Sequence, residues 1–218
     1  MVAVLRFLGS PIGRKLINGL TGFFLLLFLI VHLGGNLLLF KSRLEFNGYS
    51  ESLLKSWLIY PAEAGLALCF MYHGINATLM VLRNLRARPV RYQSKRDAGH
   101  TSRRSLASKT MIWTGVLLGI FLVVHIVTIK FGPGFGEDKR DVFGLVVHAF
   151  RSPAVVAFYV LIMLLLGFHL YHGAGTFYES LGVAHRPYLR RMLQGFAVLL
   201  SGAFLAIPVV VFFFGDKL

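Results

Sequence analysis

Histidine is the residue type whose placement in this chain points most directly to chemistry. An imidazole in an apolar setting can ligate a metal, relay a proton or act as a hydrogen-bonded core residue. Ionisable side chains inside apolar runs are costly and are functional candidates by default. Five histidines lie inside such runs: His32, His73, His125, His169 and His172.

The depth of each histidine follows from its distance to the end of its run. His32 and His125 each lie 16 residues beyond the start of an outgoing run, which at about 1.5 Å per residue places both about 24 Å from the side that carries the N-terminus. His73 and His169 each lie ten residues before the end of a returning run, about 15 Å from that side. The spacing therefore predicts an outer pair, His32 with His125, and an inner pair, His73 with His169.

Two histidines at one depth on different helices are suited to binding a b-type haem, with one imidazole on each side of the macrocycle. Two such haems stacked across the bilayer would form a transmembrane path for electrons. His172 competes with His169 for one ligand position, because residues three apart share a helix face. It would lie about 4.5 Å nearer the N-terminal side, so we favour His169 as the ligand and His172 as its neighbour or alternative.

Polar residues near the histidines are candidates for supporting them. A ligating imidazole usually donates its other N–H to a nearby acceptor. Thr21 and Thr114 lie three turns before His32 and His125 on the same faces. A hydrogen-bonding residue also follows each histidine by about one turn: Asn36, Asn76, Thr128 and His172.

The elements that must position these residues are membrane-spanning helices. The chain has 218 residues, of which 56% are hydrophobic, and its mean hydropathy is +0.68. The apolar residues are gathered into runs of 20 residues or more, which is enough to cross a hydrocarbon core of about 30 Å. Backbone groups in lipid must be satisfied internally, so the spans are helical. We predict an all-α membrane protein with one domain, residues 1–218, and five spans at about 16–40, 57–82, 110–129, 153–178 and 192–214.

Basic residues between the spans indicate the orientation. The net charge is +14, and the segments on the N-terminal side of the membrane (1–15, 83–109 and 179–191) carry 15 Lys and Arg against eight on the other side. The positive-inside rule therefore predicts a cytoplasmic N-terminus and an external C-terminus. The external segment 130–152 is predicted to contain a short helix at Val142–Phe150, whereas 41–56 is treated as a loop. The lone cysteine, Cys69, excludes a disulfide framework and covalent c-type haem attachment.

A quinone site needs a proton acceptor, apolar walls and access to a haem. Glu63 is the one carboxylate inside a predicted span, about 9 Å below the outer edge. It is therefore the candidate acceptor for quinol protons, and Glu45 and Glu51 are alternatives in the outer loop. Trp57, Tyr60 and Phe40 are candidate walls, although interfacial aromatic residues also form ordinary membrane belts.

Short motifs spread over nearly the whole chain resemble a known family. They are LTGFFLLLFLIVHLGGN (20–36), PAEAGLALCFMYHG (61–74), ASKTMIWTG (107–115), FLVVHIV (121–127), FRSPAVVAFYV (150–160), GFHLYHG (167–173) and LGVAHRPY (181–188). Their order and spacing are similar to those of the di-haem cytochrome b subunit of succinate dehydrogenases and fumarate reductases, in the single-anchor type that works with menaquinone.

This resemblance implies a bundle of the first four spans around two haem b groups, with His32 and His125 on the distal haem and His73 and His169 on the proximal one. It also implies a flavoprotein subunit and an iron–sulfur subunit on the cytoplasmic face, a prokaryotic inner membrane and menaquinone as the membrane substrate. Succinate or fumarate chemistry would then take place on the flavin of the partner. Some fumarate reductases carry a Glu two residues before the fourth ligand and use it for transmembrane proton movement, whereas this chain has Gly167 there, which has no group to carry a proton.

Three other functions compete with this one. A di-haem cytochrome b anchor of a hydrogenase or formate dehydrogenase would differ in its soluble partners. A haem-free transporter that relays protons through histidines would lack a Soret band. A membrane di-iron oxygenase, faintly suggested by HLYHG (169–173), would need several clustered histidine motifs near one face, which the chain does not supply.

Overall fold

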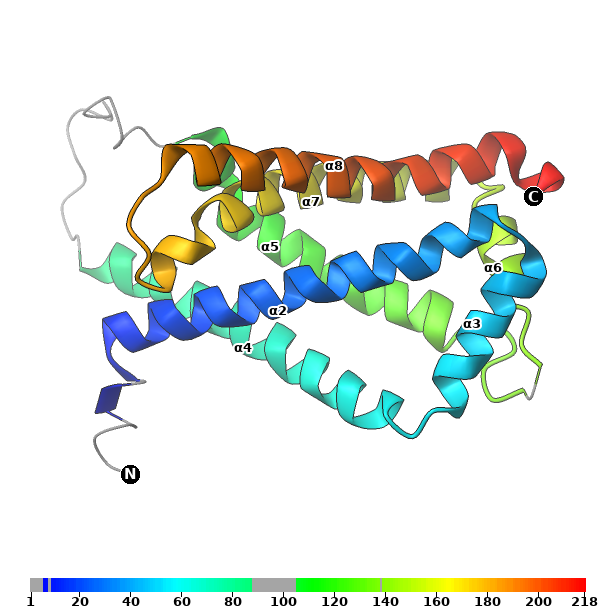
Figure 1. Ribbon diagram of the computed structural model, residues 1–218, viewed down its shortest axis with the longest axis horizontal. Helices are drawn as coiled ribbons and strands as arrows, with labels where there is room; N and C mark the ends of the chain where they lie inside the picture. Colours follow the sequence, from blue (N-terminus) through cyan, green and yellow to red (C-terminus); the bar gives the residue numbers. More distant parts are fainter. Residues whose placement is uncertain (1–5, 8, 88–104, 138) are drawn as a thin grey trace.

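The computed structural model describes residues 6, 7, 9–87, 105–137 and 139–218, and all regular structure in these ranges is helical (Figure 1). Five helices are long and apolar enough to cross a membrane. Four are unbroken α-helices: α2 (Pro11–Leu37), α4 (Ile59–Arg86), α7 (Pro153–Ser180) and α8 (Pro187–Phe214). The fifth, α5 (Leu106–His125), continues as a π-helical turn over Ile126–Lys130. The five predicted spans are confirmed. Each helix runs beyond the predicted segment at one end at least, whereas α4 begins at Ile59 and α2 ends at Leu37, inside the predicted limits.

The helices begin where local chemistry favours a start. The Ser10 hydroxyl accepts a hydrogen bond from the amide of Gly13, and Pro11 follows it as the first helical residue of α2. Ser105 caps α5 in the same way through the amide of Ser108. Proline also opens α7 and α8, where its missing N–H costs no helical hydrogen bond.

Four of the long helices form a closed ring. Contacts join α2 to α4, α4 to α5, α5 to α7 and α7 back to α2, so α2 lies diagonally opposite α5 and α4 opposite α7. The predicted four-helix bundle is therefore present. α8 lies outside the ring against α7 and α2 and buries the largest share of its residues, in keeping with the packing role expected of a span without histidine.

Two shorter helices cover the end of the bundle where the C-terminus lies (Figure 1). The short helix predicted at Val142–Phe150 is confirmed as α6 (Val142–Ala149). The expected loop at 41–56 is instead a helix, α3 (Arg43–Lys55), whose first turn is capped by the hydroxyl of Ser42. A cap of this kind with a lysine in the last turn is a helix signal that the loop interpretation overlooked.

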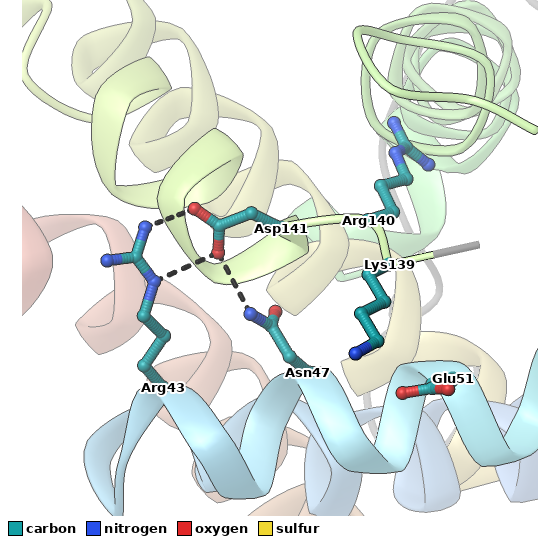
Figure 2. A pocket seen from close by; sticks show the side chains of 6 residues that line it. All are labelled: Arg43, Asn47, Glu51, Lys139, Arg140 and Asp141. Carbon is teal, nitrogen blue, oxygen red and sulfur yellow. Dashed lines mark hydrogen bonds and ion pairs between the residues drawn. The ribbon is translucent and has the colours of Figure 1, made fainter. Parts of the chain in front are cut away.

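A polar junction joins α3 to α6 (Figure 2). The Arg43 guanidinium pairs with both carboxylate oxygens of Asp141, and the Asn47 amide donates to the same carboxylate at 2.9 Å. Asp141 also caps α6 by accepting from the amide of Gly144 at 3.0 Å. Arg43 and Asn47 together hold the pKa of Asp141 well below its usual range. The junction borders an open hollow of about 350 Å³ lined also by Glu51, Lys139 and Arg140.

Candidate cofactor site: two histidine pairs inside the bundle

The structure brings the four predicted ligands together as two pairs. His32 on α2 faces His125 on α5 with ring centroids 6.0 Å apart and planes at 83°. His73 on α4 faces His169 on α7 at 6.4 Å and 67°. Each pair joins helices on opposite corners of the four-helix ring, so both pairs reach across the centre of the bundle.

The donor set fits a haem better than a metal bound by protein alone. Structural zinc takes four protein ligands, but among the described residues no group of three or more His, Cys, Asp or Glu is placed to hold a metal. A haem iron needs only axial ligands from the protein. Two imidazoles bound to one metal through bonds of about 2 Å would have ring centroids about 6 Å apart, close to both observed separations.

Hydroxyl groups engage Nδ1 of three of the four imidazoles. Thr21 Oγ1 lies 3.3 Å from Nδ1 of His73, and Thr114 Oγ1 lies 3.2 Å from Nδ1 of His169. The Tyr159 hydroxyl lies 3.1 Å from Nδ1 of His125. A ligating histidine is ordinarily held in this manner through its second nitrogen, and the arrangement would leave Nε2 able to bind a metal.

The two threonines reach the inner pair, although they share helix faces with the outer histidines. They do so because the inner imidazoles extend from neighbouring helices toward α2 and α5. The other predicted polar supports turn to main-chain groups. The Asn36 amide donates to the carbonyl of His32 at 2.7 Å, and the Asn76 amide donates to the carbonyl of Arg14 at 2.9 Å. Thr128 donates to the carbonyl of Val124 at 2.8 Å.

Aromatic rings enclose the outer pair. Phe28 stacks on His32 at 5.3 Å and Phe121 stacks on His125 at 5.4 Å, each from one turn back on its own helix. Phe204 of α8 also stacks on His32, with ring centroids 6.0 Å apart. The fifth span therefore contributes to this site as well as to packing, which the absence of a histidine in it had not suggested.

A repeat within the sequence underlies the arrangement. Positions 21–32 and 114–125 share the pattern T-G-x-x-L-x-x-F-L-x-V-H, displaced by 93 residues. Its threonines contact the inner imidazoles, its phenylalanines stack on the outer ones and its histidines form the outer pair. This repeat is the sequence signal from which the partners of Thr21 and Thr114 could have been inferred.

His172 lies one turn after His169 on α7, on the N-terminal side of the inner pair, and the ring that faces His73 is that of His169. Arg14 lies on that side too, two turns before Thr21 on the same face of α2. Its Nη1 is buried and has no hydrogen-bond partner among the described residues. A buried donor of this kind is expected to meet an acceptor such as a carboxylate.

Glu63 lies near the outer end of α4 and forms an ion pair with Lys130 in the π-helical turn of α5. The predicted aromatic walls differ among themselves: Trp57 and Tyr60 are 74% and 71% exposed, whereas Phe40 packs against the core. The alternative acceptors on α3 are also paired, Glu45 with Lys41 at 3.2 Å and Glu51 with Lys55 at 2.5 Å. Exposed tryptophan and tyrosine at a span end are typical of an interfacial belt.

Gly167 is in tight contact with α8. A Cβ atom at this position would lie 3.0 Å from Oγ of Ser201, so the packing leaves little room for a longer side chain. The glycine also borders an apolar hollow of about 350 Å³ between α5, α7 and α8, whose other walls include Leu164, Phe168 and Val198.

Comparison of the chain with protein-family models, characterised proteins and solved structures found no match.

Proposed function

We propose that this multi-pass membrane protein is the haem-carrying anchor subunit of a quinone-linked succinate dehydrogenase or fumarate reductase. The observation that carries the proposal is the pair of diagonal histidine contacts, His32 with His125 and His73 with His169, at two levels of one bundle. Each pair would hold one haem b through Nε2. The supporting sequence motifs extend over the first four spans and the segment before the fifth.

Haem, when bound, supplies reversible one-electron transfer between the membrane quinone and an iron–sulfur partner. The residues of this chain would bind the haems and orient their histidine ligands. The bundle centre supplies an apolar environment, the hydroxyls of Thr21, Thr114 and Tyr159 engage Nδ1, and the buried Nη1 of Arg14 offers a donor to an acidic group of the inner cofactor. The flavoprotein and iron–sulfur subunits would dock on the basic side of the membrane.

For the quinone reaction we propose Glu63 as the proton acceptor. Oxidation of a quinol releases two electrons and two protons, so the protons need a base near the outer pair. Lys130 of α5 pairs with the Glu63 carboxylate and so holds this candidate base in place near the start of α4. Menaquinol is the substrate that the sequence resemblance implies.

The test is to purify the protein with its native partners and record a pyridine-haemochrome spectrum. We expect two haem b per chain, with a flavoprotein and an iron–sulfur protein among the bound subunits. One haem or none in fully loaded protein would contradict the pairing. Hydrogenase or formate dehydrogenase subunits would instead identify the alternative cytochrome b anchor, and absence of a Soret band would favour a histidine-relay transporter.

Single substitutions test the ligand assignment within the same preparation. His32→Ala and His125→Ala should each remove the same haem, and His73→Ala and His169→Ala should each remove the other. His172→Ala is the matched control on α7 and should leave both haems bound. Loss of the inner haem in His172→Ala together with its retention in His169→Ala would show that the assignment is wrong.

A further inference from the structure

The inner histidines are held by two equivalent contacts related by the 93-residue repeat. In the first half, Thr21 and Gly22 of α2 lie against His73 of α4. In the second half, Thr114 and Gly115 of α5 lie against His169 of α7. The same two residue types thus meet the same ring atoms on opposite sides of the bundle.

The hydroxyl proton of Thr21 already has an acceptor in its own helix. Oγ1 lies 2.9 Å from the carbonyl oxygen of Ile17 and 3.1 Å from that of Asn18. A hydroxyl has one proton to donate and two lone pairs. With its proton directed to the main chain, Thr21 can only accept at Nδ1 of His73, so that nitrogen must carry the hydrogen.

Thr114 has the same arrangement. Its Oγ1 donates to the carbonyl of Met111 at 3.0 Å and lies 3.2 Å from Nδ1 of His169. Nδ1 of His169 is therefore the donor as well. A neutral imidazole carries one N–H, so in both rings Nε2 keeps its lone pair for a metal.

The glycines allow each ring to lie against bare backbone. A Cβ atom at position 22 would lie 3.1 Å from Cε1 of His73, and one at position 115 would lie 3.3 Å from Cε1 of His169. These distances are tighter than ordinary van der Waals contacts. The threonine hydroxyl therefore fixes one side of each imidazole, and the neighbouring glycine lets the ring approach closely enough to be fixed.

We propose that Thr21 and Thr114 are equivalent positioning residues, which hold His73 and His169 as Nδ1–H tautomers with Nε2 directed to the inner metal. This inference rests on the proposed function, because it assigns the second contact of two proposed haem ligands. It goes beyond that function by predicting a two-fold equivalence: either threonine should influence the inner haem and neither should influence the outer one.

The expected effect follows from ligand basicity. An N–H···O bond at Nδ1 makes the imidazole a stronger donor to the metal, which favours oxidised iron. Thr21→Val and Thr114→Val keep the β-branched shape and remove the acceptor, so each should raise the midpoint potential of the inner haem. A tenfold change in the preference of the ligand for oxidised over reduced iron corresponds to about 59 mV for a one-electron couple, and we expect shifts of this order.

The experiment is a potentiometric titration of both haems in the purified complex, with haem content measured alongside. Thr21→Ser and Thr114→Ser keep the hydroxyl and should retain the wild-type potential. Thr110→Val is the matched control, because the Thr110 hydroxyl donates to the carbonyl of Leu106 in its own helix. This variant should shift the potential of neither haem. The two valine variants should shift the inner potential in the same direction and to a similar extent.

Several outcomes would overturn the proposal. These are a shift of the outer haem, an inner potential unchanged by either valine variant, or a large difference between Thr21→Val and Thr114→Val. If a valine variant loses the inner haem, the serine variant decides: restored haem supports the hydroxyl role, and continued loss assigns the residue to packing. A wild-type complex without haem would overturn the proposed function itself, whereas two haems without a shift would overturn only the role of the threonines.

Discussion

At the scale of single residues, the outer pair differs from the inner pair in the hydroxyl that supports it. His125 is held by the phenol of Tyr159 from α7. The Tyr159 ring packs at 4.9 Å against Phe150 and at 5.2 Å against Phe121, both in edge-to-face geometry. These contacts fix the phenol in place, so its hydroxyl is an oriented partner for the imidazole.

We expect Tyr159→Phe to weaken the outer site alone. The substitution keeps the ring and its packing and removes the group that engages Nδ1 of His125, which should cost about tenfold in haem affinity. The measurement is haem content and midpoint potential at each site after detergent washing. Tyr171→Phe, on the same helix and 37% exposed at its surface, should change neither haem. An equal loss at both sites would indicate a general weakening of the bundle.

Glu63 and Lys130 offer a second test at this scale. If Glu63 accepts the quinol proton, Glu63→Gln should abolish or strongly slow quinol oxidation while both haem spectra remain intact. Lys130→Met removes the ion-pair partner of Glu63 and should slow turnover less than Glu63→Gln, because the carboxylate itself is still present. The readout is the steady-state rate and KM for menaquinol oxidation, and for quinone reduction with succinate as the electron donor. Wild-type rate and KM in Glu63→Gln would exclude Glu63 as the acceptor.

The sequence predicted the histidine pairing more readily than its surroundings. Depth along a helix follows from a fixed rise per residue, so histidines in runs of known ends could be matched by counting. Aromatic side chains in apolar runs carry no such signal. Phe204 and Tyr159 resemble every other membrane-facing aromatic residue until the rotation of α7 and α8 about their axes is known, and that rotation is determined by packing between helices.

At the scale of elements, the apolar runs identified the five spans and the amphipathic segment on the outer side was missed. Long hydrophobic runs have one explanation in a membrane protein, whereas α3 mixes polar and apolar residues and buries only Phe46. The π-helical turn at the end of α5 was also beyond sequence reasoning. It is stabilised by Arg140, whose guanidinium donates to the carbonyls of Ile129 and Lys130 at 2.7 Å. Arg140 lies ten positions after Lys130, so this contact is not visible in the local sequence.

The junction between α3 and α6 should show a defined pH dependence. The folded-state pKa of Asp141 is lowered by Arg43 and Asn47, so the ionised carboxylate stabilises the fold above the unfolded pKa of about 3.9. That contribution is lost as the pH falls toward the lower folded-state pKa. Asp141→Asn keeps a helix cap and loses the charge. Its Tm deficit relative to wild type should be constant above about pH 5 and should shrink below about pH 4.

Asp141→Ala separates capping from charge. Loss of an N-cap side chain costs about 1 kcal/mol at any pH, so this variant should be less stable than Asp141→Asn throughout the series. Thermal unfolding in detergent between pH 3 and pH 8 provides both comparisons. A deficit of Asp141→Asn that grows as the pH falls would contradict the assigned direction of the pKa change.

At the scale of the whole molecule, the two ends of the bundle differ. The N-terminus, the end of α4, the start of α5 and the loop between α7 and α8 lie at one end, and α3, α6 and the C-terminus lie at the other (Figure 1). By sequence, the segments that precede or connect the helices of the first end (1–15, 83–109 and 179–191) carry 15 of the 23 Lys and Arg residues. The end with α3 and α6 instead presents paired charges: Lys41, Arg43 and Lys55 each have an acidic partner.

This asymmetry gives the last prediction, which concerns the soluble partners. Arg86 ends α4 at the basic end, while Arg88 and Arg91 of the same segment lie outside the described residues. If partners dock there, reversing these three charges to Glu should weaken the retention of the partners on washed membranes. The difference from wild type should shrink at higher salt, because salt screens both the lost attraction and the new repulsion. Lys41, Lys55 and Lys139 provide the matched reversal at the opposite end, which should leave retention unchanged. Because basic loops also set orientation, the protease accessibility of the termini must be checked in each variant. Unchanged topology with unchanged retention of the partners would assign the arginines to orientation alone. Unchanged topology with lost partners would make the basic end the docking face.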